Sequence, residues 1–219
     1  MNKSRLTLAA TALALTLPLL QGCFPAIVAG TAAGVMSAHD RRSTGTQADD
    51  ESLEWKAADA IPAKFRNAAH VNVTAYNRRL LLTGEVPGDE ARSEIEAAAR
   101  GLQGVREVYN ELVVAAPSSL SVRSRDSFVT SKVKARLVDT NQVSANHIKV
   151  VTERGIVYLM GIVSEREAKV AVAVARTTDG VRKVVNVMEV VSEDETRRID
   201  NQTLGARNPP PQSAPVEKR

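Results

Sequence analysis

The chain has 219 residues, a formal net charge of +4 and a single cysteine. This length suffices for two small domains but not for a large enzyme. A single cysteine excludes any disulfide within one molecule. The catalytic motifs H-E-x-x-H and G-x-S-x-G and the phosphate-binding P-loop do not occur in the sequence, so we expect a protein that is not an enzyme.

The N-terminus has the pattern of an export signal. Two cations and no acid lie in the opening MNKSR, and an uncharged run follows from Leu6 to Leu20. This run has about 15 residues, whereas a helix needs ~20 to cross the hydrocarbon core of a bilayer. A short apolar run after a basic start is typical of a secretory signal. We therefore expect residues 1–22 to be a signal peptide that is removed on export.

The end of this run, Leu20-Gln21-Gly22-Cys23, resembles the bacterial lipobox. The resemblance implies cleavage before Cys23, a diacylglycerol group on its thiol and a further acyl chain on the new amino group. No other cofactor is expected. Phe24 follows the cysteine in place of Asp, which by the same resemblance indicates the outer membrane, with the chain facing the periplasm. The alternative is an ordinary export signal with a coincidental cysteine.

Residues 23–48 are expected to form a lipidated tether. The stretch from Phe24 to Ala38 has no charge and is rich in Ala and Gly. It is too short to span a membrane, and its small side chains make a poor core helix. Two interpretations stay open, a segment that lies at the lipid surface and a disordered spacer.

An internal duplication organises the middle of the chain. Residues 71–84 align with residues 148–161 without a gap, and the downstream strand Gly104–Asn110 matches Gly180–Asn186. Because a solenoid needs three or more stacked units, two copies indicate two small domains. We assign copy one to residues 49–115, the linker to residues 116–124 and copy two to residues 125–192.

Each copy shows the same order of helices and strands. Apolar residues at helical spacing come first, such as Val129, Val133 and Leu137 in copy two. An alternating strand pair follows, and then a second helix, which in copy two starts with the capping box Ser164 and Glu167. A closing strand completes the order αββαβ. The predicted fold class is α+β, with two helices packed on a three-stranded mixed sheet in each of two tandem domains.

The glycines Gly84 and Gly161 end the second strand of each copy. At such a position the backbone needs a positive φ or a close approach by another segment, so we expect both glycines to be structural.

The element order, these two glycines and the Gly-Val-Arg-x-Val-x-Asn strands resemble the BON domain, the "bacterial OsmY and nodulation" module. The resemblance covers both copies. A lipobox followed by two BON copies is similar to the division-associated outer-membrane lipoproteins of proteobacteria. That family resemblance implies binding of anionic phospholipids such as phosphatidylglycerol and cardiolipin. It also implies support of outer-membrane integrity and concentration at division sites.

The first helices of the two copies differ in charge. In copy one the segment DDESLEWKAADA is acidic, with Lys56 as its one cation. In copy two the segment RSRDSFVTSKVKARLVD carries five cations against Asp126 and Asp139. An anionic bilayer repels the first helix and attracts the second, by ~1 kcal/mol for each cation near the surface.

The basic helix also presents an aromatic residue. If its apolar positions face the core, Phe128, Lys132 and Arg136 form the neighbouring stripe, and we interpret Asp126 as an N-cap near the helix start. The ring can enter the headgroup region while the cations hold phosphates. The BON resemblance implies that this helix contacts lipid. The alternative is a solvated basic face with the ring in the core. The predicted phospholipid site comprises Phe128, Lys132, Lys134, Arg136 and Val138.

The two copies also differ on the sheet face that points away from the helices. Copy one has a largely polar set there, whereas copy two places apolar side chains at Val151, Tyr158, Met160, Ile162, Val185 and Val187. An apolar face of this kind must be covered. We expect copy one or another protein to pack on it.

The remaining features bear on the other function classes. Residues 193–219 are expected to be a disordered tail, because their end reads GARNPPPQSAPVEKR. His70 and His147 occupy equivalent positions of the two copies and are interpreted as strand-entry residues, so no metal site is predicted. Export and the one-sided charge argue against nucleic acid as a partner. An envelope scaffold that binds division or peptidoglycan proteins stays the alternative to lipid binding.

Overall fold

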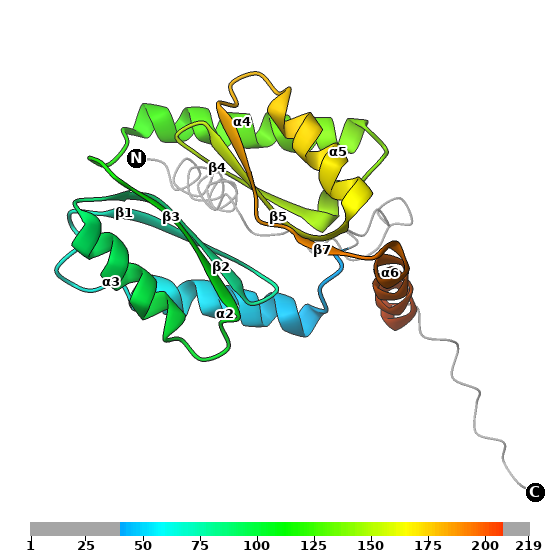
Figure 1. The fold of residues 1–219 in the computed structure, drawn as a ribbon, viewed down its shortest axis with the longest axis horizontal. Coiled ribbons are helices and arrows are strands. Elements are labelled where there is room, and N and C mark those ends of the chain that lie inside the picture. Colours follow the sequence, from blue (N-terminus) through cyan, green and yellow to red (C-terminus); the bar gives the residue numbers. More distant parts are fainter. Residues whose placement is uncertain (1–39, 208–219) are drawn as a thin grey trace, which may run out of the picture. The chain divides into compact units, whose positions relative to one another are not determined.

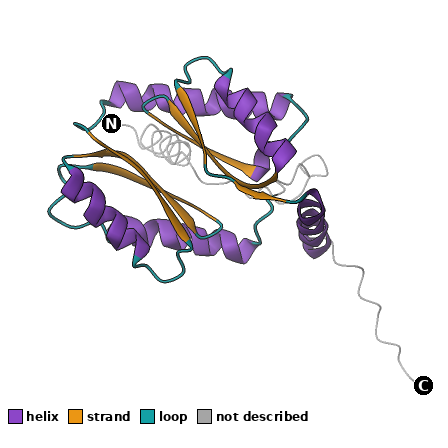
Figure 2. Ribbon diagram, viewed as in Figure 1, coloured by secondary structure: helices purple, strands orange, loops and turns teal. Residues whose placement is uncertain are grey.

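The computed structural model describes residues 40–207, with side chains up to residue 202. These residues belong to one compact unit. The predicted signal peptide, Cys23 and residues 23–39 of the tether lie outside the described residues. Two sheets face each other in this unit, and the helices of each copy cover the outer face of its sheet (Figures 1 and 2). Within residues 40–207, no helix is long and apolar enough to cross a membrane.

Copy one contains two helices and three strands, namely α2 (Thr44–Asp59), β1 (His70–Tyr76), β2 (Arg79–Val86), α3 (Asp89–Arg100) and β3 (Glu107–Val114). The strand order is β1-β2-β3, with β1 antiparallel and β3 parallel to the central β2. A two-residue turn at Asn77 and Arg78, both with positive φ, joins β1 to β2. The parallel strand β3 needs a crossover, which α3 provides.

Copy two repeats this order with α4 (Leu120–Asp139), the short 3₁₀ helix η2 (Ala145–His147), β4 (Ile148–Glu153), β5 (Ile156–Ser164), α5 (Glu165–Arg176), β6 (Lys183–Asn186) and β7 (Glu189–Val191). Strand β4 is antiparallel to β5, and β6 and β7 are both parallel to it. The closing strand is in two pieces, β6 and β7, separated by Val187 and Met188. Both sheets are mixed, which confirms the predicted α+β class with αββαβ copies.

Two helices begin earlier than the predicted domain boundaries. Helix α2 starts at Thr44, inside the predicted tether, and α4 starts at Leu120, inside the predicted linker. The reason is a serine cap at each start. The hydroxyls of Ser43 and Ser119 accept the backbone N–H three residues further on.

The prediction of a disordered tail is wrong for residues 193–207, which form α6 (Glu193–Arg207). Three acids lie in its first turn, where the positive end of the helix dipole stabilises them. Ile199 packs against the apolar cluster between the two copies. Asp200 accepts hydrogen bonds from Arg41, so α6 is attached to the compact unit. Residues 208–219 of the predicted tail lie outside the described residues.

Arg41 fixes the start of the described chain to copy two. It is 5% exposed, and its guanidinium donates to Glu167 Oε2 at 2.7 Å and to the Ile162 carbonyl at 2.9 Å. Burial raises the pKa of Glu167, but hydrogen bonds from His147, Arg41 and the Ser164 backbone outweigh it, so the pKa lies below the ordinary range. The part of the predicted tether that precedes α2 is therefore held by a buried ionic contact.

Each copy has its own core between its sheet and its helices. Val129, Val133 and Leu137 of α4 are at most 2% exposed and pack in the core of copy two, as the helical spacing predicted. Leu53 and Ala57 of α2 hold the corresponding places in copy one. Burial of such a side chain stabilises the fold by roughly 1.5–3 kcal/mol.

A buried aspartate joins the first helix of each copy to the β-hairpin. Asp126 lies inside α4 and accepts the backbone N–H groups of Arg154 and Gly155, both at 2.8 Å. It is therefore not the N-cap that the sequence suggested, because α4 begins six residues earlier. Asp50 of α2 accepts the amides of Asn77 and Arg78 in the same way, at 2.8 and 2.7 Å. The free amides of a tight hairpin turn thus find acceptors in both copies.

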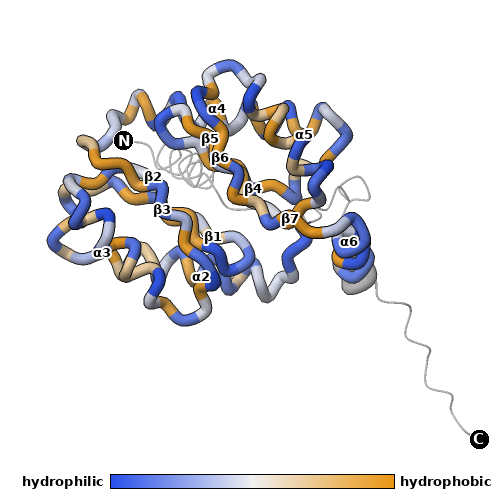
Figure 3. The backbone as a smooth tube through the Cα atoms, in the orientation of Figure 1, coloured by the Kyte–Doolittle hydropathy of each residue, from blue (hydrophilic) through white to orange (hydrophobic). Residues whose placement is uncertain are grey.

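The two sheets pack on each other through a third apolar cluster. Tyr76 and Leu81 of copy one meet Tyr158, Met160 and Ile162 of copy two, and the hydropathy colouring shows the apolar strands along this contact (Figure 3). Copy one therefore covers the apolar face of copy two, and the predicted packing is confirmed. Polar contacts border the cluster, such as Lys149–Glu54 and Asn72–Glu153, both at 2.8 Å.

Candidate functional site

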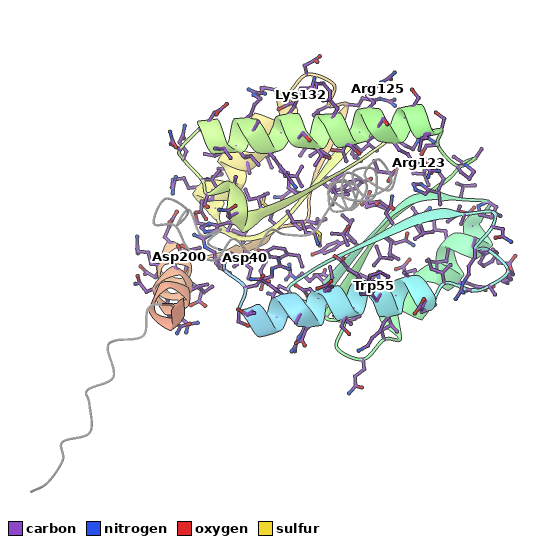
Figure 4. All side chains as sticks on the ribbon, turned by 180° about the vertical axis from the view of Figure 1, so that it is seen from behind. Asp40, Trp55, Arg123, Arg125, Lys132 and Asp200 are labelled. Carbon is purple, nitrogen blue, oxygen red and sulfur yellow. The ribbon has the colours of Figure 1, made fainter. Side chains whose placement is uncertain are left out.

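The outer side of α4 is the surface where most of the predicted site residues lie. The helix rests on copy two through its buried face, so the opposite side of α4 points away from the sheet of copy two. Arg125 and Lys132 lie on this outer side (Figure 4). Phe128 lies next to them and is 63% exposed. The alternative that placed this ring in the core is therefore wrong.

Lys132 lies beside the exposed ring. Its Nζ atom is 4.9 Å from the centroid of Phe128, which is within the range of a cation–π contact. The same ammonium group donates to Asp179 Oδ2 at 2.7 Å. This hydrogen bond holds the pKa of the Asp179 carboxyl below its ordinary value. Asp179 is fully solvated, so water screens the pair and a lipid phosphate can compete for the lysine.

Arg136 is bound more firmly to its own domain. Its guanidinium donates to Thr178 Oγ1 at 2.8 Å and to Thr177 Oγ1 at 3.1 Å. It also reaches the Val174 carbonyl, near the C-terminal end of α5, at 3.2 Å. A cation at this end is favoured by the helix dipole. Part of its hydrogen-bonding capacity is therefore used inside copy two.

The five predicted residues do not form a single stripe. Positions four apart share a face of a helix, which places Phe128, Lys132 and Arg136 on one flank. Lys134 and Val138 are also four apart, and they lie on the opposite flank of the outer side. Lys134 is exposed and Val138 is 59% exposed, so both reach solvent.

Two further residues of α4 belong to this exposed surface. Arg125 precedes Phe128 by one helical turn and lies on the same flank, as its spacing indicates. Leu120, in the first turn, is 79% exposed. The predicted site omitted both, although the three-residue spacing from Arg125 to Phe128 was visible in the sequence.

Gly84 and Gly161 lie inside β2 and β5, two and three residues before the strands end, so the prediction that they end these strands is wrong. Gly84 has a φ of +116°, and a Cβ atom there would overlap the carbonyl oxygen of His70. A Cβ atom at Gly161 would overlap the carbonyl oxygen of His147. Both glycines let the neighbouring antiparallel strand approach closely, which is a structural task.

One histidine and two carboxylates meet where the copies touch. Ligand atoms of His70, Glu85 and Glu153 all lie within 4.8 Å of one another. Each already has a protein partner: His70 contacts Glu85 at 3.0 Å, Arg154 contacts Glu85 at 3.3 Å, and Asn72 donates to Glu153 at 2.8 Å. The group therefore forms a polar contact between the copies.

The two carboxyls of this group respond to burial in opposite ways. Burial opposes ionisation of Glu85, but hydrogen bonds from the Ser118 backbone, His70 and Arg154 outweigh it and lower its pKa. Burial raises the pKa of Glu153, and its bond from Asn72 does not offset this effect.

Comparison with known proteins places both copies in one family. The model of the BON domain matches residues 49–116 and 125–192. The chain is 40% identical over 172 residues to "Outer membrane lipoprotein DolP" of Haemophilus influenzae, covering 78% of this chain and 89% of that protein.

Two other relatives show similar coverage. The chain is 39% identical to the "21 kDa hemolysin" of Actinobacillus pleuropneumoniae, over 69% of this chain and 79% of the relative. It is 28% identical to "Osmotically-inducible protein Y" of Escherichia coli K12, over 85% of this chain and 98% of the relative. The chain belongs to the BON-domain family and carries two copies of the domain.

Proposed function

We propose that this protein is a non-enzymatic outer-membrane lipoprotein that binds anionic phospholipid through α4 and supports the outer membrane at division sites. The acyl chains on Cys23 hold it to the membrane, and the two BON domains face the periplasm. The name of the 40% identical relative from Haemophilus influenzae supports the location. Two or three acyl chains give essentially permanent anchoring.

The observation that carries the lipid contact is the exposed ring of Phe128 with Lys132 at 4.9 Å. Insertion of the ring removes apolar area from water, and the ammonium group beside it meets the phosphate layer. Arg125 lies one turn away on the same flank and adds a second cation. The anchor keeps α4 close to the bilayer, so a contact of modest intrinsic affinity is sufficient.

The test uses the mature chain without acyl groups, residues 24–219, and vesicles of phosphatidylglycerol and phosphatidylethanolamine. Wild-type protein should sediment with the vesicles and be released as salt rises. Phe128→Glu removes the inserted ring and adds a negative charge, so it should weaken binding by about 2 kcal/mol or more, which is more than tenfold.

The matched control is Ser52→Glu, since Ser52 holds the place of Phe128 when Asp50 and Asp126 are aligned. It adds the same charge to α2 and should leave vesicle binding within twofold. Equal loss in both variants would show a general charge effect, and no loss in Phe128→Glu would refute the α4 contact.

A protein-binding role in the envelope is the second candidate, and Trp55 favours it. This side chain is 69% exposed on α2, in an acidic setting that repels anionic lipid. An exposed aromatic of this kind is typical of a protein contact. If the unlipidated chain does not sediment with vesicles at any salt concentration, protein binding replaces lipid binding as the proposed function.

A further inference from the structure

A groove on the far side of α5 from α4 is not used by the proposed α4 contact. It encloses about 400 Å³ between the outer flank of α5 and the edge strands β6 and β7. Val172 and Ala173 of α5 form one wall, and Val190, which is 50% exposed, forms the other. Its polar boundary comes from Glu165, Lys169, Arg176 and Asn186.

One end of this groove is cationic. A second hollow shares Val172 and Arg176 with the first and continues along α5 to Arg182 and Lys183. All three cations are exposed. Among the ion pairs found between residues 40 and 202, none includes Arg176, Arg182 or Lys183, whereas Lys169 is paired with Glu165 at 2.7 Å. An apolar channel thus leads to three cations whose charge is not neutralised by a neighbouring acid.

In copy one, a polar network of hydrogen bonds fills the position that corresponds to this groove. Helices α3 and α5 have the same length, and Glu96 of α3 takes the position of Val172 of α5. Glu96 accepts from Asn110 at 2.7 Å and from Arg100 at 2.6 Å. Asn186 and Arg176 hold the places of these two partners in copy two, but Val172 offers them no acceptor. The duplicated scaffold therefore carries an open apolar groove in copy two at the point where copy one is sealed.

We propose that this groove binds a single-chain anionic lipid, with the acyl chain against Val172 and Val190 and the phosphate at Arg176, Arg182 and Lys183. Its volume lies in the range of small-ligand pockets, about 300–1,000 Å³, with mostly apolar walls and a few polar groups at one end. A stable protein interface needs about 800 Å² from each partner, far more than one groove supplies. The complementary charge selects an anionic headgroup. The inference rests on the proposed membrane location but not on the α4 contact.

The test titrates the unlipidated mature chain with lauroyl-lysophosphatidylglycerol below its micelle concentration, followed by calorimetry and by NMR shifts. The lipid should shift the amides of Val172, Val190 and their neighbours on α5 and β7. Lysophosphatidylcholine with the same chain should bind at least fivefold more weakly, because its headgroup has no net negative charge. Inorganic phosphate alone should give no saturable binding.

Val172→Glu is the decisive variant. It places a glutamate beside Asn186 and Arg176, as Glu96 lies beside Asn110 and Arg100 in copy one. It should reduce the affinity for the lysolipid at least tenfold and keep a wild-type amide spectrum outside the groove. Val190→Glu, on the exposed strand wall, should give the same loss and replaces Val172→Glu if that variant does not fold. Glu96→Val in copy one is the control that should leave lysolipid affinity at copy two within twofold, and Phe128→Glu tests whether the lysolipid binds at α4 instead.

The outcomes separate this inference from the proposed function. Unchanged lysolipid binding in both groove variants overturns the groove, as does loss of binding in Phe128→Glu, which would assign the lysolipid to α4. The absence of shifts with all three probes also overturns it. Loss of vesicle binding in Phe128→Glu tests α4 alone and is independent of these results.

Discussion

Helices α2 and α4 hold the same place in two copies of one fold, yet their surfaces are opposite in charge. The three buried positions of α2 align with buried positions of α4, and they include the aspartates Asp50 and Asp126 that accept the hairpin amides. Their outer faces differ: α2 exposes Trp55 among acids, and α4 exposes Phe128 among cations. Positions that pack against the sheet are constrained by the fold, whereas positions in solvent are not. The outer faces are therefore where the two helices differ most.

Substitution of Gly84 in β2 or Gly161 in β5 should have the largest effect on stability, and the two copies should differ. Gly84→Val adds both an overlap with the His70 carbonyl and a strained φ of +116°, whereas Gly161→Val adds only the overlap with His147. Each variant should lose at least about 3 kcal/mol, and the loss should be greater for Gly84→Val. Denaturant unfolding of each variant measures this difference. Equal or small losses in both would contradict the close approach of the strands.

Substitution of the two aspartates that accept the hairpin amides should have the next largest effect on stability. Asp50→Asn and Asp126→Asn replace one accepting oxygen by an NH₂ group that faces a backbone N–H, so each should cost roughly 1.5–3 kcal/mol. Asp50 also accepts from Arg42 at 2.7 Å, so Asp50→Asn should cost more than Asp126→Asn. Chemical denaturation again reports the result, and Asp139→Asn, at the exposed end of α4, is the control with no expected loss.

These two aspartates show what the sequence could and could not predict. Hydrophobic spacing and the duplicated strands located the elements of both copies, because each signal lies within one helix or hairpin. The partners of Asp126 lie 28 and 29 residues away, so nothing beside it in the chain revealed its task. Local spacing alone instead suggested an N-cap.

The structure at the two ends of the described chain was not predicted either, because its contacts are also distant in sequence. Arg41 contacts Glu167 and Asp200, which are 126 and 159 residues distant. Its segment therefore resembled a continuation of the tether. The acids in the first turn of α6 are a helix signal, but the Pro-rich stretch after it dominated the composition. At the candidate site, charge and aromatic content were enough to single out α4 as the candidate helix. The flank on which each residue lies could be assigned only once the structure gave the start of α4 and its buried face.

The stability of the contact between the copies should depend on pH, because the pKa values of Glu85 and Glu153 are shifted in opposite directions. The pKa of Glu85 is lowered in the fold, so its ionised form stabilises the protein above the unfolded pKa, and this stability is lost as pH falls through the folded pKa. The pKa of Glu153 is raised by burial, so its stabilising effect is present below the unfolded pKa and is lost as pH rises through the folded pKa.

At neutral pH, Glu85→Gln should therefore lower the melting temperature, and Glu153→Gln should raise it slightly, because Gln keeps an acceptor for Asn72 and carries no charge. Both differences should shrink in acid, where the wild-type carboxyls are protonated. Thermal melts from pH 3 to pH 8 measure the two curves. The same sign for both variants at neutral pH would contradict the different surroundings of the two carboxyls.

The smallest effect distinguishes the two flanks of α4. If the Phe128 flank meets the bilayer, Arg125→Gln should weaken binding to phosphatidylglycerol vesicles by ~1 kcal/mol, which is about fivefold, whereas Lys134→Gln should change it by less than twofold. Each variant removes one exposed cation from the same helix, so net charge is matched and only position differs. Equal losses would mean that the bilayer senses the total charge of α4 and not its orientation. A larger loss in Lys134→Gln would place the contact on the flank of Val138, with Leu120 and Val138 as the inserted side chains.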